Sequence, residues 1–229
     1  MRKLLGDRFT LIELMVVLAI IMLLTSILFP ALKKSRDTAK AIACLGNLKQ
    51  IGIAECLYAS DFLGWSPPVH SLFHSSNPLP VWHQNLSNNA YLPVSKVGKP
   101  TIVVCPGNPP YVYEDLERTY AMPLTGNGQP YRLDSGYVIG ADDKKSYATA
   151  SEFILSVDSA YDNPSNATFH LRQYYYFTLG LAWAPTTKIG ARHNGCANAV
   201  FADGHAKSVS AQGLIGLSGV MPNNIYIQK

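Results

Sequence analysis

The feature that most constrains this chain is an apolar run close to its N-terminus. From Phe9 to Phe29 the sequence reads FTLIELMVVLAIIMLLTSILF, and Glu13 is the only charged residue in it. A helix of about 21 residues spans roughly 30 Å, which is the thickness of the hydrocarbon core of a bilayer. A cleaved secretory signal has a shorter apolar region that ends in small residues, whereas the sequence PALKK follows this run. The run therefore predicts a single transmembrane helix.

Charge is concentrated at the same end of the chain. Residues 1–49 contain eight Lys or Arg and three Asp or Glu, whereas residues 50–229 contain eleven and twelve. The nearly neutral remainder gives no basic surface for a nucleic-acid partner. Basic residues flank the apolar run on both sides, so the positive-inside rule nearly cancels. The eight residues before the run are too few to form a domain, which favours a cytoplasmic N-terminus and a C-terminal body outside the membrane.

Glu13 is the most informative single residue of the run. An ionised carboxylate inside an apolar helix is costly unless it is paired, so an intramembrane Glu indicates function by default. The alternative is that Glu13 lies near the lipid headgroups and stays hydrated, since it is only five residues into the run.

The segment FTLIEL at residues 9–14, with the apolar stretch after it, resembles the prepilin-type N-terminus of type IV pilins and type II secretion pseudopilins. In that family a prepilin peptidase cleaves before the Phe, the new N-terminus is methylated, and the Glu is implied to neutralise the terminal amine of a neighbouring subunit. The family has Gly directly before the Phe, but here Gly6 is followed by Asp7 and Arg8. The resemblance favours cleavage between Arg8 and Phe9. Without cleavage Glu13 would lack its partner, and the protein would be a simple anchor.

After Pro30, where many pilin stems carry a kinking proline, the pattern predicts an amphipathic stem helix over residues 30–60. Mostly apolar residues recur there at spacings of three and four, namely Ala41, Cys44, Leu45, Leu48, Ile51, Ala54, Glu55 and Tyr58. Gly46 and Gly52 weaken the prediction by up to about 1 kcal/mol each relative to Ala. The helix is expected to end at residues 61–64.

The rest of the chain has the pattern of short strands and loops. Eleven of the fifteen prolines lie between residues 67 and 130, which predicts irregular loops there. Strands are predicted at Thr101–Cys105, Phe153–Asp158 and Arg172–Thr178. The expected fold is α+β and pilin-like, with a long N-terminal helix packed on an antiparallel sheet. Its parts are a leader-like cytoplasmic segment (1–8), the transmembrane helix (9–29), the stem (30–60) and an extracytoplasmic β-rich body (61–229).

Two segments near the C-terminus, residues 197–202 and 205–209, flank Asp203-Gly204 and predict a β-hairpin with a two-residue type I′ turn. His193 precedes Asp203 by ten residues, so the ending resembles the H-x9-DG group of pseudopilin-like bacterial proteins. That resemblance also implies a disulfide between Cys44 and Cys105, which an extracytoplasmic location would permit.

The sequence contains few groupings that could do chemistry. His193, Asp203 and His205 have the donor types for a zinc site, but their spacing does not force them together. The alternative is that they only stabilise the base and turn of the hairpin. No nucleophile stands in a recognisable relation to a base, and no glycine-rich phosphate loop is present. We therefore expect neither an enzyme nor a bound cofactor.

Together these observations predict a structural subunit of a type IV pilus-like or type II secretion-like filament in a bacterial inner membrane. Its partners would be other pilin-like subunits, bound through the N-terminal helix, together with a prepilin peptidase and membrane lipid. The alternative is a membrane-anchored binding protein that does not polymerise. It would capture a solute or glycan through the loop with Trp65 and Trp82 or through the strand Tyr174–Tyr176.

Overall fold

The computed structural model describes residues 10–69, 81–109, 111–124, 130–133, 137–139, 146–163, 165, 172–178, 187–215, 217 and 225–227. The chain divides into two compact units, Met1–Ala39 and Lys40–Lys229. Helix α1 (Leu11–Asp61) contributes a section to each of them. We call Leu11–Ala39 the apolar section of α1 and Lys40–Asp61 its body section.

The predicted transmembrane and stem helices are one helix. Pro30 lies inside α1 and does not interrupt it, although a proline removes one hydrogen bond of the helical ladder. The predicted end is confirmed, because α1 stops at Asp61 and the chain then turns through two positive φ angles, 55° at Leu63 and 85° at Gly64. The Gly64 N–H donates to the Ala59 carbonyl oxygen at 2.7 Å, which satisfies one of the last helical acceptors.

The body section of α1 has the predicted buried face. Cys44, Leu48 and Ile51 are fully buried, and the three- and four-residue spacing continues through Ala54 to Tyr58. This face belongs to the main hydrophobic core of the protein. The amphipathic pattern therefore identified the core-facing residues of α1 before any tertiary contact was known.

Two three-stranded sheets make up most of the β structure. One has the order β4-β8-β9 and is antiparallel throughout, with β4 at Ile154–Val157, β8 at Cys196–Phe201 and β9 at Ala206–Ser210. The other has the order β10-β7-β5, in which β5 pairs antiparallel and β10 parallel with the central strand; the strands are β5 (Ser159–Tyr161), β7 (Thr187–Ala191) and β10 (Ile225–Ile227).

Four other short strands form two further pairs, and two short helices complete the described elements. The pair β1–β6 is parallel and the pair β2–β3 antiparallel; their bounds are Met122–Leu124, Tyr176–Thr178, Tyr137–Ile139 and Ser146–Ala148, in that order. The helices are α2 (Trp82–Asn88) and α3 (Ala211–Ile215). The α+β class and the antiparallel main sheet are thus confirmed, with two parallel pairings that the sequence did not indicate.

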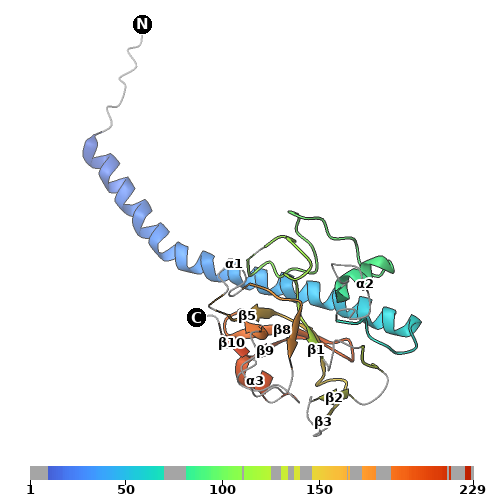
Figure 1. Ribbon diagram of the computed structural model, residues 1–229. Helices are drawn as coiled ribbons and strands as arrows, with labels where there is room; N and C mark the ends of the chain where they lie inside the picture. The colour runs from blue at the N-terminus through green and yellow to red at the C-terminus, as the bar shows by residue number, and fades with distance from the viewer. Residues whose placement is uncertain are drawn as a thin grey trace. The chain divides into compact units, whose positions relative to one another are not determined.

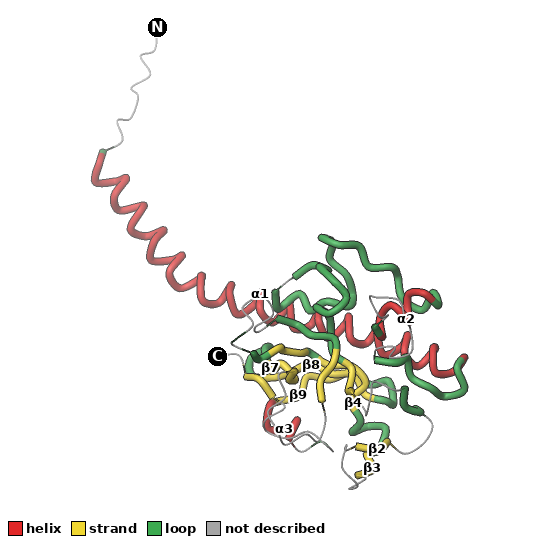
Figure 2. The backbone as a smooth tube through the Cα atoms, in the orientation of Figure 1, coloured by secondary structure: helices red, strands yellow, loops and turns green. Residues whose placement is uncertain are grey.

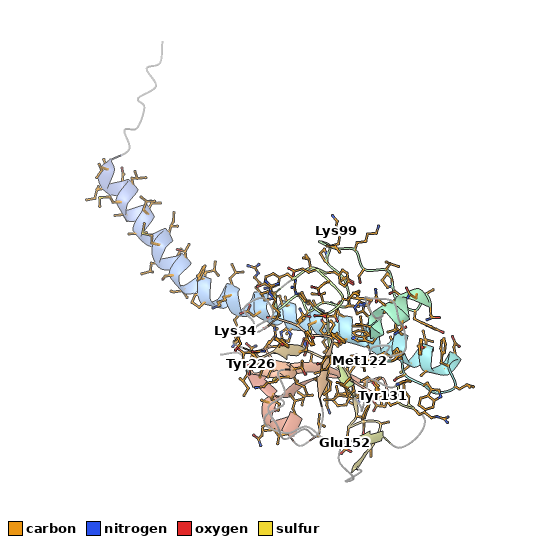
Figure 3. All side chains as sticks on the ribbon, in the orientation of Figure 1. Lys34, Lys99, Met122, Tyr131, Glu152 and Tyr226 are labelled. Carbon is orange, nitrogen blue, oxygen red and sulfur yellow. The ribbon has the colours of Figure 1, made fainter. Side chains whose placement is uncertain are left out.

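The body section of α1 lies between the strands on one side and long loops on the other (Figures 1 and 2). On the sheet side the Ser156 hydroxyl of β4 donates to Glu55 Oε1 at 2.7 Å. On the loop side Asn47 Nδ2 donates to the Val104 carbonyl oxygen at 3.4 Å. In Figure 3 Met122 lies among the core side chains, whereas Lys99 lies at the outer edge of a loop. Helix α1 therefore supplies the central layer of this unit.

Two of the predicted strands differ from the structure. The prediction of a strand at Thr101–Cys105 is wrong, because the Val104 N–H turns back to the Thr101 carbonyl oxygen. The backbone of Cys105 then bonds on both sides to the Gln173 side chain, at 2.8 Å and 3.2 Å, instead of to a neighbouring strand. The predicted strand Arg172–Thr178 is shorter in the structure, where β6 alone forms. Gln173 lies outside β6, and its side chain bonds to the loop that contains Cys105. Helix α2 was not predicted.

The C-terminal hairpin is confirmed, but its predicted two-residue turn is wrong. The Phe201 N–H donates to the His205 carbonyl oxygen, so three residues form the loop. Gly204 has a φ of 82°, whereas Asp203 is not among the residues with positive φ. A three-residue loop with Gly in the left-handed region is the next most common hairpin connection, and it needs only one such residue.

Candidate functional site

The apolar section of α1 is exposed along its whole length. Every residue from Leu11 to Ala39 is exposed, including large side chains such as Leu24 and Phe29 at 60% and 73%. By length and composition α1 can cross a membrane once, near the N-terminus of the chain. Arg8 and Phe9 lie outside the described residues, so cleavage between them and methylation of Phe9 stay predictions.

Glu13 has a local role that the sequence analysis missed. Its Oε2 atom accepts hydrogen bonds from the Thr10 backbone N–H at 2.8 Å and from the Thr10 hydroxyl at 2.6 Å. The Glu13 N–H in turn donates to Thr10 Oγ1 at 3.3 Å. This reciprocal arrangement is a capping box at the start of α1. The pattern Thr-x-x-Glu before an apolar run was the available signal.

Four buried ligand-type side chains meet inside the body unit. Cys44 comes from α1, Cys105 from the loop that follows α2, Asp158 from the junction of β4 and β5, and His193 from the turn between β7 and β8. One donor atom of each residue lies within 4.8 Å of the other three. Three separations are shorter: Cys44 Sγ to Asp158 Oδ1 is 3.2 Å, Cys105 Sγ to His193 Nε2 is 3.4 Å, and His193 Nε2 to Asp158 Oδ2 is 3.3 Å. We call these four residues the Cys2HisAsp cluster.

The chain holds the members of the cluster in place through neighbouring backbone groups. The Gly107 N–H donates to Cys105 Sγ at 3.3 Å, and the Asn198 N–H of β8 donates to Asp158 Oδ2 at 2.9 Å. Gly107 also allows close approach, because a Cβ atom at that position would lie 2.6 Å from His193 Cε1. The side chains are therefore oriented before any ligand arrives.

Burial and mutual contact shift the protonation of the cluster. Burial raises the pKa of Cys44 well above its usual value, while the hydrogen bond from Cys44 lowers the pKa of Cys105 against the opposing effect of burial. Burial by itself disfavours the charged His193 ring, but hydrogen bonds with Asp158 and Cys105 outweigh it and raise the pKa of His193 to about 10. Within the cluster, Cys105 therefore loses its proton more readily than Cys44, and the His193 ring favours its protonated form.

A buried cation lies beside the cluster. Arg192 directly precedes His193, and its Nη2 donates to the Ser159 carbonyl oxygen at 2.5 Å. Its Nε and Nη1 atoms are buried and have no hydrogen-bond partner among the described residues. Burial lowers the pKa of Arg192, and the negative charges of Asp158 and Cys105 counteract that effect. The guanidinium therefore adds positive charge next to the anionic members of the cluster.

The predicted disulfide partners are neighbours in space. Cys44 and Cys105 both belong to the cluster, and the structure holds them as free thiols whose sulfur atoms lie within 4.8 Å of each other. Cys56 and Cys196 are also free and lie outside the cluster. The proximity agrees with what the resemblance implied, while the disulfide bond itself stays a prediction.

The possible metal-ligand set considered from the sequence, His193, Asp203 and His205, does not form a group in the structure. In the part of the chain that is described, the one group with metal-ligand donors is the Cys2HisAsp cluster, which includes His193 alone of the three. Asp203 and His205 pair with each other, Oδ1 to Nδ1 at 2.5 Å, and both are 36% exposed. The reason is that Asp203 lies in the hairpin loop and His205 closes it, whereas His193 lies before β8, at the far end of that strand.

The aromatic residues considered for ligand binding are mostly packed. Trp82 is fully buried, so it offers no surface to a glycan. Trp65 is 42% exposed and lies against Arg132, 5.7 Å from ring centroid to guanidinium carbon. The rings of Tyr174, Tyr175 and Tyr176 are partly buried and pack on one another. The described residues that line a pocket of about 420 Å³ beside the end of α1 include no aromatic residue. These positions do not favour the binding-protein alternative.

Comparison of the chain with protein-family models, with curated proteins and with solved structures gave no significant match in any of the three. The assignment of function therefore rests on the chain's own residues. Among these, Asp158 is the site residue that sequence reasoning missed. The available signal was a carboxylate directly after the apolar strand segment Phe153–Val157, a position at which a charge is normally not buried.

Proposed function

We propose that this protein is a membrane-anchored, pilin-like structural subunit that assembles with other such subunits through the apolar section of α1. The observation that carries the proposal is the contrast within one helix. The body section is the central layer of a packed unit, whereas the apolar section exposes a continuous row of Leu, Ile, Val and Met side chains. Soluble proteins rarely expose apolar patches of this size without a lipid or protein partner.

Glu13 provides the specific part of the proposal. In a filament its carboxylate would face the N-terminal amine of a neighbouring chain, provided that the peptidase removes residues 1–8. Removal requires cleavage between Arg8 and Phe9, where Gly would give the peptidase easier access than the bulky, charged Arg8. Mass spectrometry of the N-terminal peptide of membrane-extracted protein tests this step. We expect a species that begins at Phe9, and a chain beginning only at Met1 or Arg2 would contradict cleavage.

The assembly role of Glu13 can be separated from its role in the capping box. Glu13→Gln keeps an acceptor at the third helical position, so the cap persists, but it removes the negative charge. Thr10→Ala removes the hydroxyl of the cap and leaves the charge. If Glu13 acts on a neighbour's amine, Glu13→Gln abolishes assembly and Thr10→Ala retains it; if Glu13 only caps α1, Thr10→Ala is the more damaging change.

The measurement is photo-crosslinking of the full chain in bacterial membranes that also contain a prepilin peptidase. A photoreactive residue replaces Leu18, which is 45% exposed in the apolar section, and in a control it replaces Val97, which is 73% exposed in the body. We expect a ladder of crosslinked copies from position 18 only, lost in Glu13→Gln, with membrane insertion unchanged. Absence of the ladder in the unaltered chain would refute the proposal and leave a simple membrane anchor.

A further inference from the structure

We propose that Cys44, Cys105, Asp158 and His193 bind one divalent transition-metal ion, with Zn²⁺ as the best fit, in a closed structural centre. This inference is independent of filament assembly. The four side chains supply two sulfurs, one imidazole nitrogen and one carboxylate oxygen, all of which are established zinc donors.

The separations between the donor atoms match those required around a tetrahedral ion. Zinc bonds of about 2.3 Å to sulfur and about 2.0–2.1 Å to nitrogen or oxygen place neighbouring ligand atoms about 3.3–3.8 Å apart. Cys44 Sγ lies 3.2 Å from Asp158 Oδ1, whereas His193 Nε2 lies 3.3 Å from Asp158 Oδ2 and 3.4 Å from Cys105 Sγ. With one donor atom taken from each residue, every separation is within 4.8 Å. Rotation of the Asp158 carboxylate, together with contraction of the longer separations, would bring one donor atom of each residue into the first coordination sphere.

Burial specifies what kind of centre this is. Cys44, Cys105 and Asp158 are at most 1% exposed, and the His193 side chain is 6% exposed. Four protein ligands fill a tetrahedral site, so no position is left for a substrate, which is the arrangement of structural rather than catalytic zinc. The ion would crosslink four segments, since residues 44 and 158 are 114 positions apart in the chain.

The surroundings of the cluster have the features of a second coordination shell. Metal ligands are normally oriented by hydrogen bonds from outside the first shell. Here the N–H groups of Gly107 and Asn198 bond to the ligand atoms of Cys105 and Asp158. On the backbone side the Tyr120 hydroxyl donates to the Cys44 carbonyl oxygen at 3.4 Å, and the Gln173 side chain holds Cys105.

The charge balance also fits a divalent ion. Two thiolates and one carboxylate around a divalent cation with a neutral imidazole leave one net negative charge. Arg192, whose buried Nε and Nη1 have no hydrogen-bond partner in the part of the chain that is described, supplies the compensating positive charge. On binding, each sulfur and the imidazole nitrogen that still carries a proton releases it to solvent, and no oxidant or reductant is consumed.

The competing state is the Cys44–Cys105 disulfide, which uses the same two sulfur atoms and excludes them as thiolate ligands. The experiment therefore measures metal and thiols on the same sample. The full chain is purified in detergent without chelator or reductant and analysed for bound metal by mass spectrometry. In parallel, thiols are titrated after unfolding in the presence of a chelator. We expect about one zinc ion per chain and four reactive thiols.

Variants locate the ion and supply matched controls. Cys105→Ser and His193→Gln should lower zinc affinity at least tenfold, whereas Cys56→Ser and Cys196→Ser, which change cysteines outside the cluster, should leave it unchanged. Cobalt added to the metal-free unaltered chain should give a thiolate-to-cobalt charge-transfer absorption, a readout that needs no variant to fold. Two missing thiols without reductant, or zinc retained in Cys105→Ser, would overturn the proposal.

Discussion

The two sections of α1 are built from similar apolar residues but meet opposite environments. In the body section one face of the helix is buried completely among strands and loops, while in the apolar section no residue is buried. Hydrophobic side chains therefore act in two different ways along one helix. Those of the body section stabilise this chain's own fold, and those of the apolar section are left for lipid or for other chains.

The largest expected effect comes from the same substitution made in both sections. Leu48→Ala removes a fully buried side chain, so it should lower the free energy of unfolding of the body by about 2–5 kcal/mol through lost burial and a cavity. Leu24→Ala, at a site 60% exposed, should change it by less than about 0.5 kcal/mol. Denaturant unfolding of the full chain in detergent, followed by tryptophan fluorescence, measures the free energy of unfolding of both variants. Equal effects would contradict the difference between the two sections of α1.

A buried carboxyl, Glu55, should make the stability of the body unit depend on pH. Glu55 is fully buried against Ser156, and burial raises its pKa to about 8. Because the pKa of Glu55 is raised, the folded state binds the Glu55 proton more tightly than the unfolded state does. The stabilisation from protonated Glu55 is therefore fully present below about pH 4.5 and is lost as the pH rises towards 8. Between pH 5 and pH 7 the Glu55 carboxyl should lower the free energy of unfolding by about 2–3 kcal/mol, and Glu55→Gln should abolish this decrease.

The check is the difference in free energy of unfolding between Glu55→Gln and the unaltered chain at several pH values. This difference cancels the titration of other groups, provided that they are unaffected by the substitution. It should grow from pH 5 to pH 8 in favour of Glu55→Gln. A constant difference over that range would mean that Glu55 is ionised in the folded protein.

The sequence predicted those parts of the molecule that depend on local pattern. The length and buried face of α1, its end near Asp61, the strand β4 and the C-terminal hairpin all follow from periodicity and turn residues. What it could not predict depends on contacts between distant segments. Thr101–Cys105 has the composition of a strand, but the Gln173 side chain takes up the backbone hydrogen bonds of Cys105.

The same reasoning applies to the candidate site. The residues Cys44, Cys105 and His193 were each singled out from the sequence, but for a disulfide and for a hairpin site. Their convergence with Asp158 is set by packing α1 against the β4–β5 junction and the loop that contains Cys105. Residues 44 and 158 carry no mutual spacing signal, because a tertiary contact over such a distance leaves no periodicity in the sequence.

The two faces of the body section can be compared through its glycines. Gly52 is buried against β8, and a Cβ atom there would lie 2.4 Å from Val200 Cγ2. Gly52→Ala should therefore lower the free energy of unfolding by about 1–3 kcal/mol, because helix and strand must move apart. A smaller partner tests the cause: Val200→Ala in the Gly52→Ala background should recover part of the loss. Failure of that rescue would mean that the clash is not the reason.

The smallest expected effect has the opposite sign and lies six residues earlier. Gly46 is on the exposed face of α1, and a Cβ atom there meets no atom of the described residues within 4 Å. Both glycines lower the helix propensity of the sequence equally. At Gly52 packing leaves no room for a side chain, whereas at Gly46 an added methyl group meets no such obstacle. Gly46→Ala should raise the free energy of unfolding by about 0.5–1 kcal/mol, chiefly by restricting the unfolded chain. The same denaturation assay measures it, and a Gly46→Ala chain less stable than the unaltered chain would contradict the prediction.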